Sequence, residues 1–301
     1  MIKAAYVLRI LQRGADMERN YYYACYGSDV IAVPEYCDFE HMFRVLEYQK
    51  EPKCGLELNI YTDLVRVGHD RKILEYKDAL KKYRVSFHAP HWETDASADL
   101  DSPKGKTNIK AYEEALALAD EIGVKSMVMH THQCKVEESR KDEMRKNVVK
   151  TVKVFNEMCR VHGVELLVEN VGFHCTDSML YDQNEYVELF ESLPEDVGSL
   201  IDTGHAILNG WDIDKLICDL GTRIKSYHIH NNGGDKDSHM NLFAENMKYS
   251  PAQVEAMFLT MEEITPSANM IFEYGPKAHV TPESMHKDFA RVDAIRKSYY
   301  L

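Results

Sequence analysis

Short apolar segments alternate along this chain with longer segments in which apolar residues recur every three or four positions. The short segments have the length and the β-branched content of buried strands, and the longer ones have the period of amphipathic helices. Strands separated by helices of this length predict βα units on a parallel sheet. The seven candidate strands span residues 55–60, 83–90, 125–131, 164–170, 197–202, 224–230 and 269–274.

Two of the intervening helices are well defined by their periodicity. Residues 106–123 place five apolar side chains near one face, namely Ala111, Ala115, Leu116, Leu118 and Ala119. Residues 142–163 follow the same pattern. Both segments end in glycine, which commonly follows the last turn of a helix.

The fold class follows from the number of βα units. The eighth strand must come from the first 50 residues, where the apolar runs 3–8 and 29–34 are both candidates. Eight βα units in 301 residues have the size of a (β/α)8 TIM barrel. A doubly wound sheet is the alternative, but no glycine-rich phosphate-binding turn follows the first strand. We therefore expect one α/β domain over residues 1–301, a TIM barrel whose first 50 residues the pattern does not assign.

Side chains that can bind metal ions stand at the end of one candidate strand after another. The series consists of His88, His130, Glu169, Asp202, His228 and Glu273. His205 follows three residues after Asp202, and the loop after His228 carries Asp237 and His239. The carboxyl ends of barrel strands meet at one mouth, where barrel enzymes have their active sites. We therefore expect these residues to surround one small volume.

Each of these residues has an ordinary structural explanation when it is taken alone. Asp202, which precedes Thr-Gly, is a good helix N-cap, and Glu169 and Glu273 suit ion pairs. The whole series is not explained in this way, because an apolar strand that ends in a carboxylate buries charge at a cost unless a cation compensates it. Histidine and carboxylate ligands without cysteine favour Zn²⁺, Mn²⁺, Co²⁺ or Fe²⁺ over Ca²⁺. The sequence therefore predicts a divalent metal site, with zinc and manganese both open.

Composition limits the partners and the compartment. A net charge of −13 disfavours broad binding to nucleic acid, which requires lysine and arginine against phosphates. The 7 cysteines include no C-x-x-C pair, so neither a disulfide framework nor a cysteine zinc site is indicated. No apolar run reaches the roughly 18 residues of a membrane span, and the N-terminus has no signal-peptide pattern. We expect a cytoplasmic protein without a membrane partner, and a homo-oligomer is compatible with the sequence.

The motifs around these residues resemble those of the xylose isomerase-like barrel superfamily. The most specific is IDTGHAILNGWDI (201–213), which is similar to the D-T-x-H segment of that superfamily with its following G-x-D. ENVG (169–172), HIHNNGGDKDSH (228–239) and FHAP (87–90) are similar to its glutamate-asparagine strand end, its histidine-aspartate loop and one of its early histidines. The superfamily includes sugar and sugar-phosphate isomerases and epimerases, and zinc-dependent endonucleases of the endonuclease IV type that act at abasic sites.

The resemblance implies a role for each strand-end residue. The metal quartet common to both branches would consist of Glu169, Asp202, His228 and Glu273. In the endonuclease branch a second ion would be held by Glu169 with His88 and His130, and a third by His205, Asp237 and His239. His230 lies on the same strand face as His228 and is expected at the rim of the site or behind its ligands. One to three divalent ions per chain are therefore implied.

The first function that these residues support is the isomerisation or epimerisation of a small sugar or sugar phosphate. A divalent ion would bind the carbonyl and hydroxyl oxygens of the sugar and stabilise an enediolate. Glu169 and Glu273 would be the base and the acid. His205 would contact the substrate, and Trp92 and His230 would line the pocket.

The alternative is phosphodiester hydrolysis at an abasic site, which alone would make nucleic acid a partner. The full ligand set favours it. The acidic charge, the short loop between His228 and Asp237 and the lack of an arginine-aromatic cluster for opening a duplex disfavour it, and Asn231 replaces the aspartate usual after the H-x-h motif. A non-catalytic metal-binding barrel is a third reading, but no ligand is missing. The sequence favours the isomerase or epimerase.

Overall fold

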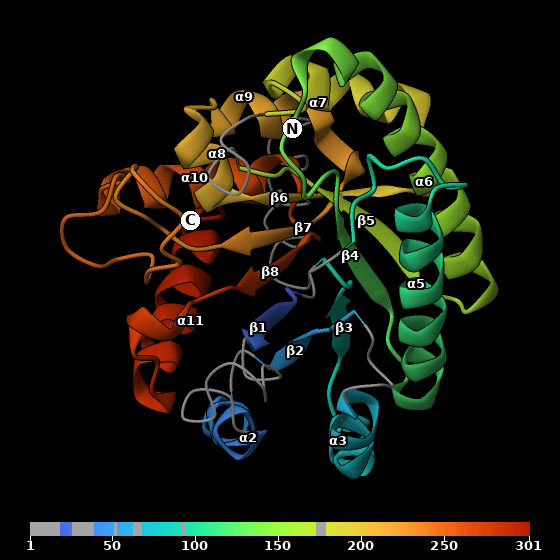
Figure 1. Cartoon of the computed structure of the whole chain (residues 1–301). Coiled ribbons are helices and arrows are strands. Elements are labelled where there is room, and N and C mark those ends of the chain that lie inside the picture. The colour runs from blue at the N-terminus through green and yellow to red at the C-terminus, as the bar shows by residue number, and fades with distance from the viewer. Residues whose placement is uncertain (1–18, 26–38, 51–52, 63–67, 92–93, 173–178) are drawn as a thin grey trace, which may run out of the picture.

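The computed structural model describes residues 19–25, 39–50, 53–62, 68–91, 94–172 and 179–301. Within these ranges eight parallel strands form a closed barrel, in which each strand pairs with the next and β8 pairs with β1 (Figure 1). The strands are β1 (Tyr21–Cys25), β2 (Cys54–Asn59), β3 (Val85–His88), β4 (Ser126–His130), β5 (Glu165–Glu169), β6 (Gly198–Asp202), β7 (Ile224–Ile229) and β8 (Asn269–Phe272). The prediction of a (β/α)8 TIM barrel is confirmed.

Helices connect the strands and surround the barrel (Figure 1). The α-helices are α2 (Phe39–Tyr48), α3 (His69–Glu75), α4 (Lys77–Leu80), α5 (Pro103–Ile122), α6 (Lys141–Val161), α7 (Gln183–Leu189), α8 (Thr203–Asn209), α9 (Ile213–Leu220), α10 (Pro251–Ile264) and α11 (Pro282–Ser298). Short 3₁₀ helices are η2 (Glu138–Arg140), η4 (Phe190–Ser192), η5 (Gly221–Arg223) and η6 (Pro276–Ala278). Among the described residues, none of the helices has the length and apolar character needed to cross a membrane.

The helices predicted at 106–123 and 142–163 are α5 and α6. The hydroxyl of Ser102 caps α5 by accepting a hydrogen bond from the backbone N–H of Gly105 (3.0 Å), and Pro103 occupies the first turn, as is common at helix starts. After α5, Gly123 has a φ of 86°, a left-handed conformation that glycine adopts without strain. The two boundaries thus follow from local residue chemistry.

The first strand, β1, corrects the sequence prediction. The candidate ranges 3–8 and 29–34 lie outside the described residues, and neither is the first barrel strand, because Tyr21–Cys25 pairs with both β2 and β8. Tyr21 is fully buried against α11, where its hydroxyl donates to Oδ1 of Asp293 (3.0 Å). Aromatic residues favour strands as strongly as β-branched residues do. The tyrosine run therefore forms a strand although it contains no valine, isoleucine or threonine.

Alternation along the strands decides which side chains face the inside of the barrel. A small apolar cluster, separate from the main core between strands and helices, consists of Tyr22, Ala24, Val128, Leu167, Leu200 and Ile271. Successive side chains of a strand point to opposite faces, so residues two positions apart share a face. Two positions after four members of this inner cluster stand His130, Glu169, Asp202 and Glu273. The strand period therefore directs these side chains into the barrel mouth.

The opposite end of the barrel contains a buried ion network. Glu262 of α10 accepts hydrogen bonds from Nη2 of Arg19 (2.7 Å) and from Nε of Arg296 in α11 (2.6 Å). Nη2 of Arg296 donates to the backbone carbonyl of Pro266 (2.7 Å), shortly before β8. The network joins the start of β1 to the last two long helices. Its position at the N-terminal face of the strands indicates a role in stability.

Candidate metal centre

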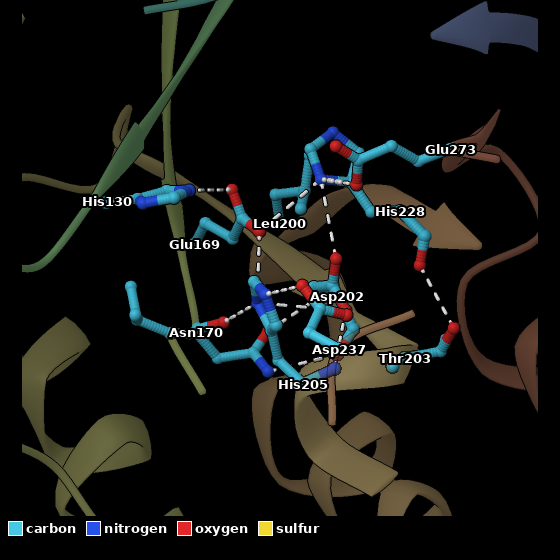
Figure 2. A network of polar contacts seen from close by, with 12 residues as sticks. His130, Glu169, Asn170, Leu200, Asp202, Thr203, His205, His228, Asp237 and Glu273 are labelled. Atoms are coloured by element: carbon cyan, nitrogen blue, oxygen red, sulfur yellow. Dashed lines mark hydrogen bonds and ion pairs between the residues drawn. The ribbon is translucent and has the colours of Figure 1, made fainter. Parts of the chain in front are cut away.

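The strand ends from β3 to the residue after β8 bring the predicted ligands to one mouth of the barrel. In the strand register His130 lies opposite Glu169, and Asp202 lies opposite His228. Figure 2 shows side chains from β4, β5, β6, β7 and the end of β8 directed toward one another. The structure thus brings together residues that are separated by up to about two thirds of the described chain, as the barrel closure requires.

Four of these residues form what we call the central group: Glu169, Asp202, His228 and Glu273. Nδ1 of His228 lies 3.4 Å from Oε1 of Glu169, 3.8 Å from Oδ2 of Asp202 and 3.1 Å from Oε2 of Glu273. All four residues are at most 5% exposed. Three carboxylates therefore surround one imidazole nitrogen in a buried space, and the ligand atoms of Asp202, His228 and Glu273 lie within 4.8 Å of one another.

A second set, which we call the His88–His130 group, shares Glu169 with the central group. Oε2 of Glu169 lies 3.4 Å from Nε2 of His88 and 3.2 Å from Nε2 of His130. The other oxygen, Oε1, faces His228, so the two oxygens of Glu169 serve two different groups. In Figure 2 the carboxylate of Glu169 lies between His130 and His205. Glu169 is thus placed as a bridging carboxylate.

The third set, the loop group, consists of His205, Asp237 and His239. Oδ2 of Asp237 lies 3.5 Å from Nε2 of His205 and 2.6 Å from Nε2 of His239. The loop that carries Asp237 and His239 is closed by Asn231, whose backbone pairs with Met240 and whose side-chain amide donates to the carbonyl of Leu242 (3.0 Å). Asn231, at the position where an aspartate is usual, holds the loop instead of adding a carboxylate.

The imidazoles of the two flanking groups have a common orientation. In each, Nδ1 makes a hydrogen bond to a neutral oxygen, and Nε2 faces a carboxylate. The pairs are His88 with Ala89 O (3.1 Å), His130 with Gln133 Oε1 (3.0 Å), His205 with Asn170 O (2.8 Å) and His239 with Glu273 O (3.1 Å). A hydrogen bond that fixes one ring nitrogen and leaves the other for an ion is typical of metal-binding histidines.

His228 is held differently, by a residue that the sequence analysis missed. Oε1 of Glu57, on β2, lies 2.7 Å from Nε2 of His228. Glu57 is only 2% exposed. The available signal was a glutamate in the middle of the apolar strand GLELN, which buries its charge at a cost unless it has a partner.

Asp202 combines two roles, a helix N-cap and a candidate metal ligand, which the sequence presents as alternatives. Its Oδ1 accepts a hydrogen bond from the backbone N–H of His205 (2.6 Å) and caps α8. Its Oδ2 faces His228 and His230. The N-cap bond fixes the carboxylate so that the second oxygen points into the central group.

Of the two positions expected for His230, at the rim or behind the ligands, the structure has the second. His230 is 1% exposed, and its Nε2 lies 3.1 Å from Oδ2 of Asp202. Its ring stacks on that of His239 at a centroid distance of 4.0 Å. On the other side it packs on Gly204, where a β-carbon would come within 1.9 Å of the ring. The glycine of the D-T-G-H segment is therefore required by this ring.

Trp92, the other predicted pocket residue, lies outside the described residues. Its neighbour His91 is partly buried, and its ring centroid lies 4.6 Å from that of His88 and 5.1 Å from that of His130. Burial, together with the adjacent His88 and His130, lowers the pKa of His91 well below its ordinary value. The sequence analysis missed His91, although it follows the FHAP motif directly.

Opposite charges balance one another in the central group without a metal ion. Burial by itself lowers the pKa of His228, but the carboxylates of Glu273, Glu57 and Glu169 raise it well above the ordinary value. Burial likewise favours the neutral form of Glu169, but His130 and His228 hold its pKa well below the ordinary value. His228 and His239 do the same for Glu273. A divalent cation could take over the compensation that the imidazole protons supply.

The residues present fit such a cation. Oε2 of Glu169 and Nδ1 of His228 are buried and make no hydrogen bond within the described part of the chain, which is costly for polar atoms unless they meet a cation. Within the described ranges, five sets of three residues have ligand atoms within 4.8 Å of one another. Every member of the five sets is a histidine, an aspartate or a glutamate, and such ligands suit zinc or manganese.

The sequence matches the family described as xylose isomerase-like TIM barrel over residues 37–289. No curated protein matches the sequence.

Solved structures with the same fold include enzymes of different activities. 3-Keto-D-glucoside 4-epimerase (YcjR) from E. coli is 14% identical, with 92% of this chain and 100% of that chain covered and a TM-score of 0.65. The IOLI protein with a bound zinc atom is 15% identical over 94% of this chain and 99% of its own, with a TM-score of 0.65. An AP endonuclease of family 2 from Brucella melitensis is 17% identical, with 90% of this chain and 98% of that chain covered and a TM-score of 0.65. At these identities the likeness establishes the fold.

Proposed function

We propose that this chain, which belongs to the xylose isomerase-like TIM barrel family, is a metal-dependent isomerase or epimerase of a small sugar or sugar phosphate. The observation that carries the proposal is the placement of Glu169 and Glu273 on either side of one imidazole nitrogen, Nδ1 of His228, at 3.4 and 3.1 Å. Two carboxylates from different strands are thereby aimed at one point, as proton removal and return at neighbouring positions of a sugar require.

The central group would hold a zinc or manganese ion through Glu169, Asp202, His228 and Glu273. Such an ion, when bound, supplies a Lewis acid that polarises a carbonyl oxygen of the sugar and acidifies the neighbouring C–H bond. The chain contributes the fixed directions of these four side chains. The N-cap bond from His205 N–H to Asp202 and the hydrogen bond between Glu57 and His228 set two of them.

The carboxylates of Glu169 and Glu273 would move the proton. Histidines hold the pKa of each glutamate low, so both carboxylates are in the form that accepts a proton. One of them would take the proton from the carbon next to the carbonyl, which leaves an enediolate and a protonated carboxyl. In an isomerisation this carboxyl would return the proton to the neighbouring carbon. In an epimerisation the other glutamate, after taking a proton from solvent, would deliver it to the opposite face of the same carbon, and the first carboxyl would release its proton to solvent.

Further residues would bind and enclose the substrate. Nδ1 of His205 lies 3.3 Å from Oε1 of Glu169, and its Nε2 lies 3.5 Å from Oδ2 of Asp237. We assign Nε2 to the sugar hydroxyls when the loop group holds no ion. His230 would keep Asp202 and His239 in place from behind. Trp92 stays a predicted pocket residue. The E. coli neighbour of the same fold is named as an epimerase of a keto-glucoside, which is consistent with a carbohydrate substrate.

The alternative proposal is hydrolysis of a phosphodiester at an abasic site. The observation that favours it is the placement of Glu169, whose two oxygens face two separate ligand groups, beside a third group in the loop. A neighbour of the same fold is named as an AP endonuclease. The net charge of −13 opposes binding to a polyanion. We therefore rank this function second.

Metal content and two assays distinguish the functions. The chain is purified without chelator and without added metal, its zinc and manganese are counted per chain, and it is incubated with ketoses in D₂O and with an abasic duplex. Deuterium at the carbon next to the carbonyl, with an ion in the central group, supports the isomerase or epimerase. Three zinc ions and cleavage of the duplex overturn it in favour of the endonuclease. No bound metal and no exchange overturn both.

A further inference from the structure

We propose that Glu57 is a positioning residue that fixes His228 and sets the affinity of the central group for its metal ion. The inference rests on the proposed function in one respect, that the central group binds a divalent ion. It concerns a residue on β2, a strand that contributes none of the predicted ligands. Its test is a binding measurement, which does not depend on the identity of the substrate.

The contact between Glu57 and His228 crosses the barrel interior. Oε1 of Glu57 lies 2.7 Å from Nε2 of His228, and both residues are at most 2% exposed. A carboxylate only accepts hydrogen bonds, so Nε2 of His228 must carry the hydrogen. The lone pair for an ion is then on Nδ1, which is the nitrogen that faces Glu169, Asp202 and Glu273. Glu57 thereby selects the nitrogen that binds metal.

A second contact holds Glu57 in place. Ser86, on β3, donates its hydroxyl hydrogen to Oε2 of Glu57 (2.9 Å). The two residues are direct partners in the register of β2 and β3, so the contact comes from the pairing of the strands. Each oxygen of Glu57 therefore has one partner, and the carboxylate cannot turn away from His228 without losing both.

Charge distinguishes His228 from the other imidazoles of the site. The Nδ1 atoms of His88, His130 and His205 bind the neutral oxygens of Ala89, Gln133 and Asn170. Among these four described imidazoles, His228 alone has a carboxylate hydrogen-bonded to the ring nitrogen that points away from the central group, namely Glu57 at Nε2. Nδ1 of His205 also lies 3.3 Å from Oε1 of Glu169, but Glu169 is itself one of the proposed ligands. A carboxylate behind a histidine makes the imidazole a stronger electron donor to an ion. The central group should therefore bind zinc more tightly than it would with a neutral acceptor at position 57.

The test is a zinc titration of Glu57→Gln. Glutamine has nearly the same shape, and its amide oxygen can still accept the hydrogen bond, so the substitution removes chiefly the charge. All proteins also carry H88A and H239A, which disable the two flanking groups and leave the four central ligands. Zinc affinity is measured by competition with a coloured chelator. We expect E57Q to bind zinc about 10- to 100-fold more weakly.

The matched control is Glu165→Gln. Glu165 is also a strand glutamate, but it is exposed at the start of β5, so zinc affinity should be unchanged. Equal zinc affinity in E57Q and the parent overturns the proposal, as does an equal loss in E165Q. If the parent binds no zinc, the proposed metal-dependent function fails with it, whereas zinc binding that E57Q leaves unaltered overturns the role of Glu57 alone.

A spectroscopic measurement separates positioning from a general loss of structure. In the zinc-loaded parent, the Nε2–H proton of His228 should give a slowly exchanging, downfield NMR signal, because the proton is buried against a carboxylate. E57Q should move that signal upfield. Ser86→Ala, which keeps Glu57 but frees one of its oxygens, should weaken zinc binding less than E57Q does. If E57Q does not fold, S86A tests the role of Glu57 in its place. Unchanged zinc affinity in S86A then overturns the proposal.

Discussion

Oε2 of Glu273, at the residue after β8, lies 3.1 Å from Nδ1 of His228 on β7. The contact joins neighbouring strands at the point where Glu169 and Asp202 also arrive. It connects one proposed proton-transfer group to the imidazole that would bind the ion. A change at Glu273 should therefore affect both chemistry and metal binding.

Glu273→Gln should abolish most of the exchange of the sugar C–H proton with solvent. Glutamine keeps the size of the side chain but cannot accept the proton, and loss of one acid–base group costs about 10²- to 10⁴-fold in rate. The rate of deuterium incorporation is measured at saturating metal, so that weaker metal binding is compensated. Glu195→Gln, an exposed loop change, is the control. An undiminished rate in E273Q would remove Glu273 from the mechanism.

Gly204→Ala should disturb the centre through His230. The added methyl group would overlap the His230 ring, which lies within 1.9 Å of its position, and overpacking of this kind costs about 1–3 kcal/mol. The ring should move away from Asp202, and zinc affinity should fall with stability. Urea unfolding and zinc titration measure the two effects. In the double variant G204A/H230A the smaller side chain at position 230 should leave room for the added methyl group. The double variant should therefore lose less stability than the two single variants together, and an additive loss would contradict the contact.

Glu262→Ala should destabilise the fold without changing the metal centre. Glu262 is buried with Arg296 and accepts hydrogen bonds from Arg19 and Arg296. Removal of one partner from a buried ion network leaves charge uncompensated and costs about 3–5 kcal/mol. Urea unfolding should reveal the loss, while the metal content per folded chain stays constant. Glu263→Ala, on the exposed side of α10, should cost little, and an equal loss in both variants would refute the role of the network.

Asp288 should make a contribution to stability that depends on pH. Its Oδ2 accepts a hydrogen bond from the hydroxyl of Tyr274 (2.8 Å). Burial raises the pKa of Asp288 above 3.8 despite the opposing effects of Tyr274, Asn241 and Arg291. The folded state therefore holds this proton more tightly than the unfolded state. The contribution of Asp288 becomes more favourable as the pH falls from above the raised pKa toward 3.8.

Asp288→Asn tests the sign of this effect. At neutral pH the amide avoids the cost of burying a charge, so D288N should be at least as stable as the parent. As the pH is lowered through the titration range, the free energy of unfolding of the parent should increase relative to that of D288N. The free energy of urea unfolding of both proteins is compared at pH 7 and in mild acid. If the stability of the parent relative to D288N instead increases as the pH rises, the sign of the linkage is opposite and the prediction is wrong.

The sequence by itself determined the barrel and the ring of polar strand ends. The alternation of strands and helices along the chain predicts the βα units, and the period of two along each strand places Glu169 on the same face as Leu167. A carboxylate at the end of an apolar strand is a local feature, and its cost when buried can be judged without coordinates. The convergence of nine predicted residues follows from these local patterns together with barrel closure.

The tertiary structure decided the contacts that cross the barrel. The hydrogen bond between Glu57 and His228 joins residues 171 positions apart, and it depends on closure and register, which no local pattern encodes. The burial of His230 likewise depends on the space that Gly204 leaves beside it. The tyrosine strand β1 was recognised only from its pairing with β2 and β8, because Tyr21 fits the core through contacts with the distant helix α11. Local periodicity determines which face a side chain takes, whereas its partners depend on how distant strands meet.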